Sequence, residues 1–560
     1  MKTTRSNEGW IAEYVIPFKT FRFSNAPSQE WGLNMARQVM RLNEDAYWSP
    51  LPPRYNIFRV SVAGTLTGLE NIRQGRNLYV KPFVTARTVQ SRGPTGRLET
   101  LDALTNPGGY DGGLDLKYSL TPALTLDATY RTDFAQVESD QQQVNLTRFN
   151  LFFPEKRDFF LENRGVFELG PGGNLVPFFS RRIGLDGAGT PIPIVGGTRV
   201  SGKVNQYAVG FLAMKTEKLG TTPSNTYLVG RVKRDLFRNS WVGALVTHRD
   251  STVARDYNRV YGADAHFQFY QKLEFDMYLL GSETPGLSGA NQARRFQTLW
   301  RDDELTISGE YNAAQTHFNP EMGFIRRTDV SHYASEVSWA PRFEQSDTLR
   351  NLTFGTSLDY YESGSTGDIE TRTQDATAGI TFENNSSMTF VATQTFERLV
   401  RPFRIRSNVL IPSGDYRYRA YSSRFTTNQS RKISGSSAVS WGEFWNGTQR
   451  SYRGDFTLKP NMHLNVDLIY NRNDVKLATG SFTTNLVGTR LIYGFSPRAF
   501  FNTFIQYNAD THQVSSNLRF NFKHGPLSDV YLVYDDRRST LNGELVDRAF
   551  IFKVTNLFSF

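Results

Sequence analysis

Alternation of apolar and polar side chains, repeated in short segments along most of the chain, is the feature that most constrains the fold. From about residue 76 onward, segments of roughly ten alternating residues are separated by breaks. Two clear examples are KLEFDMYLL at 272–280 and HLNVDLIY at 463–470. A period of two places the apolar side chains on one face of a β-strand and the polar ones on the other. The segment length matches the ~9 to 11 residues that a tilted strand needs to cross a bilayer.

The breaks between these segments alternate in length. Short breaks lie near residues 119–123, 204, 269, 300, 383 and 524, and long ones span 91–109, 216–225, 249–257, 282–292, 314–330, 398–413 and 536–546. Tight turns at one end and long loops at the other are typical of outer-membrane barrels. We therefore predict an all-β fold, a large transmembrane antiparallel β-barrel of about 24 strands, with a range of about 22 to 26. The same parity places both chain termini in the periplasm of a Gram-negative envelope.

Composition supports a barrel over other membrane folds. The hydrophobic share is 39%, and no run approaches the ~18 to 20 apolar residues of a membrane-spanning helix. Aromatic residues make up 14%, which suits the girdles at the two membrane surfaces. The chain has no Cys, so disulfides, thiolate metal sites and Cys nucleophiles are excluded.

The formal net charge of +10 raises the question of which partners the chain binds. Its basic residues are scattered through the alternating strands instead of forming a run, so we expect no nucleic acid partner. Contacts within the lumen, the loops or lipopolysaccharide are the favoured use of these cations. The expected partners are outer-membrane lipid, lipopolysaccharide and the barrel-assembly machinery, with glycans or other envelope proteins as further candidates.

The chain ends in an alternating aromatic strand, RAFIFKVTNLFSF, whose last residue is Phe560. One face of this strand is almost entirely apolar, as expected for the last strand of a membrane barrel, whose outer face contacts lipid. A terminal Phe on such a strand resembles the C-terminal signature of bacterial outer-membrane proteins, which their assembly machinery reads. We therefore expect Phe560 to act as an assembly signal.

Several long segments resemble a known family. Residues 10–48, which begin WIAEYVIPF, resemble the second half of the carbohydrate-binding family 9-like sandwich that precedes the barrel in the bacterial family DUF5916. The resemblance continues through DFAQVESDQQQVNLTRFNLFFPEKRDFFLENRGVF at 133–167, FFSRRIG at 178–184 and FNPEMGFIRRTDV at 318–330, and covers nearly the whole chain. It departs at the front, where only about 50 residues of the sandwich remain and no signal-peptide core is visible, so an incomplete start is expected.

The resemblance implies two parts, a partial carbohydrate-binding family 9-like periplasmic segment at residues 1–60 and the barrel at 61–560. In a complete sandwich, Trp10, Trp31 and Trp48 are candidates for stacking on sugar rings. In a truncated sandwich, the same three residues are expected to form its core instead.

Residues 139–196 form a long connection, about 58 residues, that far exceeds common loop lengths. Its many Phe and Leu residues would make an unusually large apolar patch if they were exposed. We predict that the connection folds back into the lumen as a plug or constriction, held by charge-assisted hydrogen bonds more than by an apolar core. The residues expected in it are Asp133, Glu138, Asp140, Arg148, Glu155, Lys156, Arg157, Asp158, Glu162, Arg181 and Arg182, with Glu321, Arg326, Arg327 and Asp329 from the connection at 318–330.

Enzyme signatures are absent from the sequence. There is no Gly-x-Ser-x-Gly elbow, no phosphate-binding Gly-x-x-x-x-Gly-Lys loop and no His-Glu-x-x-His pair, so we expect no catalytic residue, metal or cofactor. The function predicted is porin-like transport of a solute, with a glycan as candidate, gated by the internal loop. Two alternatives stay open: a non-conducting scaffold or docking subunit of an envelope assembly, and, more remotely, a glycan hydrolase using Asp133, Glu138 and Asp140.

Overall fold

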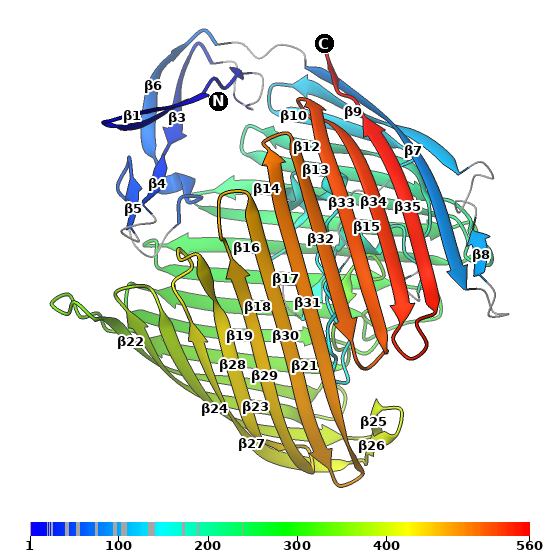
Figure 1. Ribbon diagram of the computed structural model, residues 1–560. Coiled ribbons are helices and arrows are strands. Elements are labelled where there is room, and N and C mark those ends of the chain that lie inside the picture. The colour runs from blue at the N-terminus through cyan, green and yellow to red at the C-terminus, as the bar shows by residue number, and fades with distance from the viewer. Residues whose placement is uncertain are drawn as a thin grey trace.

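In the part of the chain that the structure describes, twenty-four long β-strands close into one antiparallel barrel (Figure 1). The predicted fold class and strand number are confirmed. This computed structural model describes residues 2–18, 21, 23, 26–39, 44–51, 56–72, 77–92, 98–101, 109–132, 140–170, 174–187, 189, 191–237 and 239–560.

The barrel strands follow one another around the wall in chain order, and each pairs with its sequence neighbours. They are β7 (Leu78–Arg92), β9 (Tyr110–Thr121), β10 (Leu124–Tyr130), β12 (Ile194–Val204), β13 (Tyr207–Thr216), β14 (Asn225–Leu236), β15 (Ser240–Ser251), β16 (Tyr257–Phe269), β17 (Leu273–Glu283), β18 (Gln292–Arg301), β19 (Leu305–Ala314), β21 (Val330–Trp339), β22 (Leu349–Ser363), β23 (Ile369–Phe382), β24 (Ser387–Leu399), β27 (Gly414–Thr426), β28 (Ile433–Phe444), β29 (Gly447–Leu458), β30 (Leu464–Leu477), β31 (Gly480–Ser496), β32 (Ala499–Asn508), β33 (Gln513–Gly525), β34 (Ser528–Ser539) and β35 (Leu545–Thr555).

The last strand closes the barrel on the first. β35 pairs with β7 from Asp547↔Ser91 to Thr555↔Phe83, and the short β36 (Phe558–Ser559) continues along the same partner. A further short strand, β8 (Leu98–Leu101), pairs with the far end of β7. Closure satisfies the backbone groups that an open sheet would leave at its two edges.

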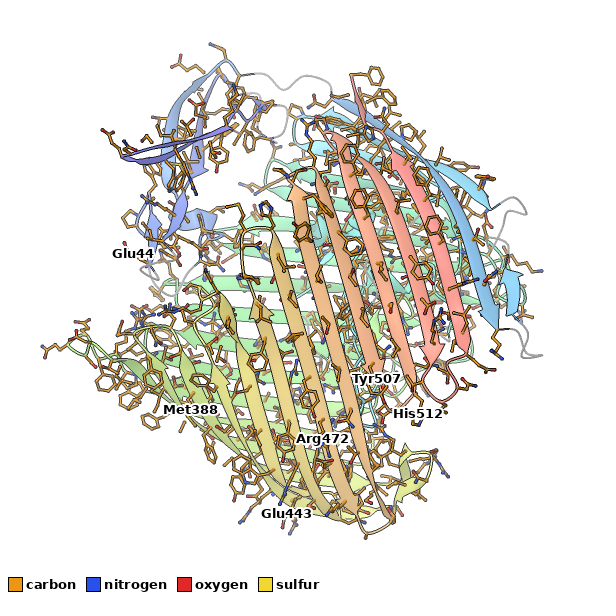
Figure 2. The ribbon with its side chains drawn as sticks, viewed as in Figure 1. Glu44, Met388, Glu443, Arg472, Tyr507 and His512 are labelled. Carbon is orange, nitrogen blue, oxygen red and sulfur yellow. The ribbon has the colours of Figure 1, made fainter. Side chains whose placement is uncertain are left out.

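The strands turn apolar side chains outward, as the sequence alternation predicts. On β17, Leu279 is 57% exposed, whereas its neighbours Tyr278 and Leu280 are buried. Met388 on β24 and Tyr507 on β32, both labelled in Figure 2, also lie on this outer face. An outer surface rich in exposed aromatic and aliphatic residues is stable against lipid and costly in water. No helix among the described residues is long and apolar enough to cross a membrane.

The two ends of the barrel have different connections, and the predicted parity holds with exceptions. Most turns at the end that carries the chain termini are short, and most connections at the opposite end are long. Residues 340–348 form a long connection at the terminal end, however, and residues 445–446 and 478–479 make tight turns at the other. At that opposite end a small hairpin, β25 (Phe403–Arg406) with β26 (Val409–Ile411), caps part of the mouth (Figure 1).

The N-terminal module lies outside the barrel, at the same end as the C-terminus (Figure 1). Its strands are β1 (Lys2–Ser6), β2 (Gly9–Glu13), β3 (Ser28–Leu33), β4 (Ala36–Val39), β5 (Glu44–Tyr47) and β6 (Gly64–Glu70), with the 3-10 turn η2 (Val60–Val62). They form three two-stranded pairs, β1 with β2, β3 with β6 and β4 with β5. β6 lies beyond residue 60, so the module's pairing extends past the expected boundary, while the first barrel strand begins at Leu78.

A long insert, residues 140–193, joins β10 to β12. It contains two single helical turns, α1 (Asp158–Leu161) and α2 (Arg164–Phe167), the short strand β11 (Leu175–Val176) and the 3-10 turn η3 (Ser180–Arg182). β11 pairs with β20 (Phe324–Ile325), which belongs to the second connection, residues 315–329 between β19 and β21. The insert and the second connection thus meet, although each starts from a different part of the wall.

Candidate functional site

The insert lies against the inner face of the barrel wall. Arg199 and Ser201 of β12 contact it and are almost completely buried. On the neighbouring β13, whose Leu212 pairs with Arg199, the adjacent Phe211 is 46% exposed and faces outward. Because successive residues of a strand point to opposite faces, the insert must occupy the side away from lipid, inside the barrel.

An apolar core joins the insert to this wall. From the insert it contains Phe160, Phe167, Leu169, Leu175 and Ile183. From the wall it contains mainly inward side chains of β12 to β19, among them Ile194, Leu212, Met214, Tyr227, Val229, Leu245, Val260, Tyr278, Leu280, Ala293 and Ala314, and Phe318, Met322 and Val330 complete it. This differs from the expectation that charge-assisted bonds, more than an apolar core, hold the insert. The inner face of β13 to β17 is itself apolar and needs a cover.

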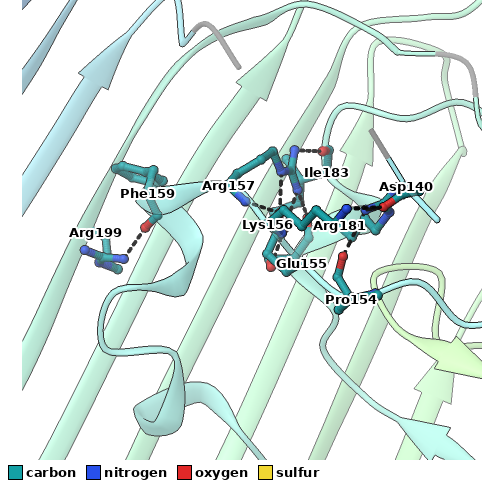
Figure 3. A network of polar contacts seen from close by, with 10 residues as sticks. Asp140, Pro154, Glu155, Lys156, Arg157, Phe159, Arg181, Ile183 and Arg199 are labelled. Atoms are coloured by element: carbon teal, nitrogen blue, oxygen red, sulfur yellow. Dashed lines mark hydrogen bonds and ion pairs between the residues drawn. The ribbon is translucent and has the colours of Figure 1, made fainter. Parts of the chain in front are cut away.

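Within the insert, Glu155 and Arg157 are the centre of a compact group of polar contacts (Figure 3). The ion pair between them is 2.6 Å long, and Arg157 donates further hydrogen bonds to the carbonyl oxygens of Ile183 at 2.7 Å and Ser180 at 2.6 Å. Burial alone would raise the pKa of the Glu155 carboxyl. The hydrogen bonds and positive charge of Arg157, helped by the Ser180 hydroxyl, hold that pKa below its ordinary value.

Asp140 links two parts of the insert and tethers its beginning to the wall. Its carboxylate pairs with Lys156 at 3.1 Å and with Arg181, which also donates to the carbonyl of Pro154 (Figure 3). The backbone carbonyl of Asp140 accepts a hydrogen bond from Gln506 on β32 at 3.1 Å. Such bonds fix the position of Asp140, the first residue of the insert that the structure describes.

Arg199 is the wall residue that holds α1 in place. Its guanidinium pairs with Asp127 of β10 at 2.7 Å and donates to the carbonyl oxygens of Phe159 and Glu162. Lys117 of β9 pairs with the Glu162 carboxylate at 2.5 Å. Asp158 begins α1 and lines a cavity of about 490 Å³ between this helical turn and the wall.

Three arginines surround the ring of Phe149. The guanidinium carbons of Arg148, Arg326 and Arg327 lie 5.0, 5.4 and 4.0 Å from the ring centre. Arg148 also pairs with Glu397 of β24 at 3.2 Å. Burial lowers the pKa of Arg327 to about 10, although the Glu397 carboxylate opposes this shift.

The second connection supplies the remaining predicted residues. Glu321 pairs with Arg249 of β15 at 2.6 Å, and Arg182 of the insert donates to the carbonyl of Gly323. The carboxylate of Asp329 accepts hydrogen bonds from Thr316, Ser363 and Ser365. Burial would raise the pKa of Asp329, but these hydroxyls hold it below its ordinary value.

Some predicted residues are not brought into this network. Asp133 and Glu138 lie outside the described residues. The three tryptophans sit apart in the N-terminal module: Trp10 lies near Arg37, Trp31 packs on Phe18, Phe21 and Phe23, and Trp48 is 54% exposed. Phe560 pairs with Leu78 through its backbone, and its side chain is 74% exposed. No group of three potential metal ligands occurs in the described ranges.

The wall residues that hold the insert were missed from the sequence. Besides Arg199 they include Arg231, which pairs with Asp264 at 2.6 Å and donates to the carbonyl of Glu168. Gln506 and Asn508 of β32 contact Asp140 and Gln142. The signal that could have found them is a charged or amide residue at an inward position of a strand, since lipid excludes such residues from the other face.

Residues 78–201, which span β7 to β12 and the insert, match the family described as Domain of unknown function (DUF5916). No curated protein matches the sequence significantly.

Among solved structures, the copper transporter OprC is 11% identical, with 90% of this chain and 83% of that chain covered and a TM-score of 0.40. OprD from Pseudomonas aeruginosa is 9% identical, with 64% and 95% covered and a TM-score of 0.31. BauA, the ferric preacinetobactin receptor from Acinetobacter baumannii, is 8% identical, with 86% and 80% covered and a TM-score of 0.36. These similarities are too low to carry a conclusion about function. The match to the DUF5916 family model covers the first barrel strands and the insert, and the chain as a whole folds as an outer-membrane-type β-barrel.

Proposed function

We propose that this protein is an outer-membrane channel for a polar solute, narrowed by an insert that stays docked on one sector of the inner wall. The observation that carries the proposal is the division of the inner wall into two sectors. Strands β12 to β19 present an apolar inner face, which the insert covers. Strands β21 to β24 and β27 to β33 present mainly polar side chains to the lumen.

The covered sector favours a fixed constriction over a loosely held plug. Burying one large apolar side chain stabilises by roughly 1.5 to 3 kcal/mol, and the insert contributes several to the shared core. Undocking would also leave Arg231 and Asp264 without the cover that now buries them, although they are paired. The insert is therefore expected to remain in place during transport.

The uncovered sector has the chemistry of a water-filled passage. Its inward positions include Thr373 and Thr377 on β23, Thr389 on β24, Ser422 on β27 and Ser436 on β28. Hydroxyls donate and accept hydrogen bonds, so they suit a wall that contacts water and polar solutes. A glycan, expected from the family resemblance, is one candidate solute.

The orientation follows from the asymmetry of the two ends. Long connections are typical of the external side of outer-membrane barrels and short turns of the periplasmic side. We therefore place the N-terminal module and the C-terminus in the periplasm. The outer face of the barrel contacts lipid and lipopolysaccharide. Phe560 is the signal that the assembly machinery recognises during insertion.

A non-conducting scaffold is the second candidate, because the insert fills part of the lumen. A glycan hydrolase is less well supported, since Asp140, one of its three proposed carboxylates, is ion-paired to Lys156 and Arg181. These ion pairs occupy the carboxylate oxygens and leave them poorly placed to contact a glycosidic bond.

Liposome swelling with neutral sugars of increasing size separates channel from scaffold. A channel admits small sugars and excludes larger ones at a definite size, whereas a scaffold gives no swelling above that of empty liposomes. The double variant Val176→Cys/Phe324→Cys sharpens the test, because these residues are paired between β11 and β20 at a Cα separation of about 5 Å that suits a disulfide.

A fixed constriction predicts equal swelling for the oxidised and reduced double variant, with Val176→Cys alone as the control. The chain has no other Cys that could form a disulfide. Slower swelling after oxidation, reversed by reduction, would show that the insert and second connection must separate for transport.

A further inference from the structure

On the inner wall from β19 to β33, inward carboxylates prevail on β19 to β24, whereas the strands from β27 to β33 carry inward guanidinium groups together with the carboxylates Asp455 and Asp467. Carboxylates occupy inward positions on consecutive strands from β19 to β24, namely Glu310, Glu336, Asp359, Asp375 and Glu397. We call this set the acidic arc. Guanidinium groups occupy inward positions on β27, β29, β31 and β33, namely Arg424, Arg453, Arg490 and Arg519, and we call this set the basic arc.

Alternation fixes the inward direction of both arcs. Glu336 and Val337 are neighbours on β21, and Val337 is an exposed apolar residue of the outer face. Arg424 and Phe425 are neighbours on β27, and Phe425 is 44% exposed on the outer face. Glu336 and Arg424 therefore point to the lumen side.

Some members of each arc are neutralised locally. Glu310 pairs with Arg295 at 2.8 Å, Asp359 with His332 at 2.8 Å, and Glu397 with Arg148 of the insert. On the other side, Arg453 pairs with Asp455 at 3.0 Å and Arg490 with Asp467 at 3.9 Å. Arg519 interacts electrostatically with Asp535 of the neighbouring β34. Two carboxylates and one guanidinium then remain without an ionic partner among the described residues.

These three groups are Glu336, Asp375 and Arg424. Glu336 and Arg424 form no ion pair with any other described residue. The carboxylate of Asp375 accepts hydrogen bonds, among the described residues, only from the hydroxyls of Ser357 and Thr393. Glu336 and Arg424 are also exposed, so both are available to a passing solute.

The arcs flank the same part of the lumen. β24 and β27 join the two walls at one edge of the barrel, so that β28 to β33 form the near wall and β19 to β23 lie on the far wall in Figure 1. A solute that moves beside the docked insert therefore meets the carboxylates of Glu336 and Asp375 on the far wall and the guanidinium of Arg424 at the edge where the two walls join.

We propose that this separation of charge makes the passage selective for solutes that carry both a positive and a negative group. A dipolar solute can satisfy both arcs in one orientation, whereas a single ion is attracted by one arc and repelled by the other. Salt limits the reach of such exposed charges to about 10 Å at 0.1 M ionic strength, so the effect is expected to be strongest at low salt. The inference rests on the proposed channel and names its solute class.

The test uses purified full-length protein in planar bilayers and liposomes. With a salt gradient across the bilayer, the wild type should discriminate little between potassium and chloride, because the two arcs oppose each other. The double variant Glu336→Gln/Asp375→Asn should shift the permeability ratio toward chloride by roughly two- to five-fold, and Arg424→Gln should shift it toward potassium.

Liposome swelling then compares a zwitterionic amino acid with a neutral sugar of matched mass. The wild type should admit the zwitterion faster, and the double variant should lose that preference. The matched controls are Glu443→Gln and Arg472→Gln, which remove charges from outward positions of β28 and β30 (Figure 2) and should change neither readout.

The outcomes separate the two proposals. If the wild type neither conducts nor swells liposomes, the channel itself is wrong. If it conducts but the inner-wall variants leave the ion and solute preferences as they were, or if the neutral sugar enters faster, the channel stands and the proposed solute class is wrong.

Discussion

Replacement of Phe160 by Ala should loosen the insert without disturbing the barrel. Phe160 is 6% exposed and lies in the core that the insert shares with the wall. The guanidinium carbon of Arg157 lies 4.3 Å from its ring centre, and the ring of Phe159 meets it edge-on at 5.2 Å. The wall strands keep their own hydrogen bonds in the variant, so the lost packing weakens the docking of the insert.

The size of the effect follows from these contacts. Truncation of a buried Phe to Ala costs about 3 to 5 kcal/mol, which includes the cavity left behind. Partial collapse of the insert brings the expected cost to the lower end of this range. Because about 1.4 kcal/mol corresponds to a tenfold change in an equilibrium, the open state of the insert should become roughly 100-fold more populated.

Hydrogen exchange measured by mass spectrometry reads this population directly, since exchange of docked backbone amides requires local opening. Exchange in the peptide around residues 155–170 should accelerate by about 100-fold in Phe160→Ala, and the wall strands should be unaffected. Phe211→Ala is the control, because Phe211 faces outward on β13 and is 46% exposed. If the insert exchanges as slowly in Phe160→Ala as in the wild type while the barrel stays folded, the apolar core does not hold it.

Three further results are expected. Unheated protein should migrate differently from heated protein on gels and give a strand-dominated far-UV spectrum, because the closed barrel satisfies its backbone internally; a large helical signal would contradict the fold. Deletion of Phe560 should lower the outer-membrane yield far more than the stability of assembled protein, since its side chain is 74% exposed; a normal yield would count against its role in assembly. The pKa of Glu155 is lowered in the folded state, so its contribution to docking is present above the ordinary glutamate pKa and is lost as the pH falls through the lowered value. Pepsin should therefore cleave the insert of the wild type faster as the pH falls below the ordinary glutamate pKa. In Glu155→Gln, which has no carboxylate at this position, the rate of cleavage of the insert should change little over the same pH range.

The barrel could be predicted from the sequence because its rules are local. Each strand alternates over a length that matches the membrane, and the lengths of the connections alternate with the strands. The insert could also be predicted, because a long aromatic-rich connection has few stable places other than the lumen. Neither inference requires knowledge of which strands face each other across the barrel.

The wall partners of the insert could not be predicted in the same way. Arg148 and Glu397 are separated by 249 positions in the chain, and Gln142 and Gln506 by 364. Such pairs depend on how far around the wall the insert reaches, which no local pattern records. The pairing of β6 with β3 was missed for a similar reason, since an intervening hairpin separates them.

The sequence contains a pattern that indicates the apolar inner wall, although our prediction did not use it. The segments of β13 and β14, YAVGFLAMKT and NTYLVGRVKRDL, contain apolar residues at both alternating sets of positions. A strand with two apolar faces must be covered on both, here by lipid outside and by the insert inside. Applied to β13 to β16, this reasoning would have predicted the docking sector.

A density map of the protein in a lipid nanodisc tests the central claim most directly. The map should show the insert docked on the inner faces of β12 to β19 and a continuous solvent path between it and β27 to β33. Density that fills the lumen from wall to wall, or an insert that lies outside the barrel, would contradict the proposed channel.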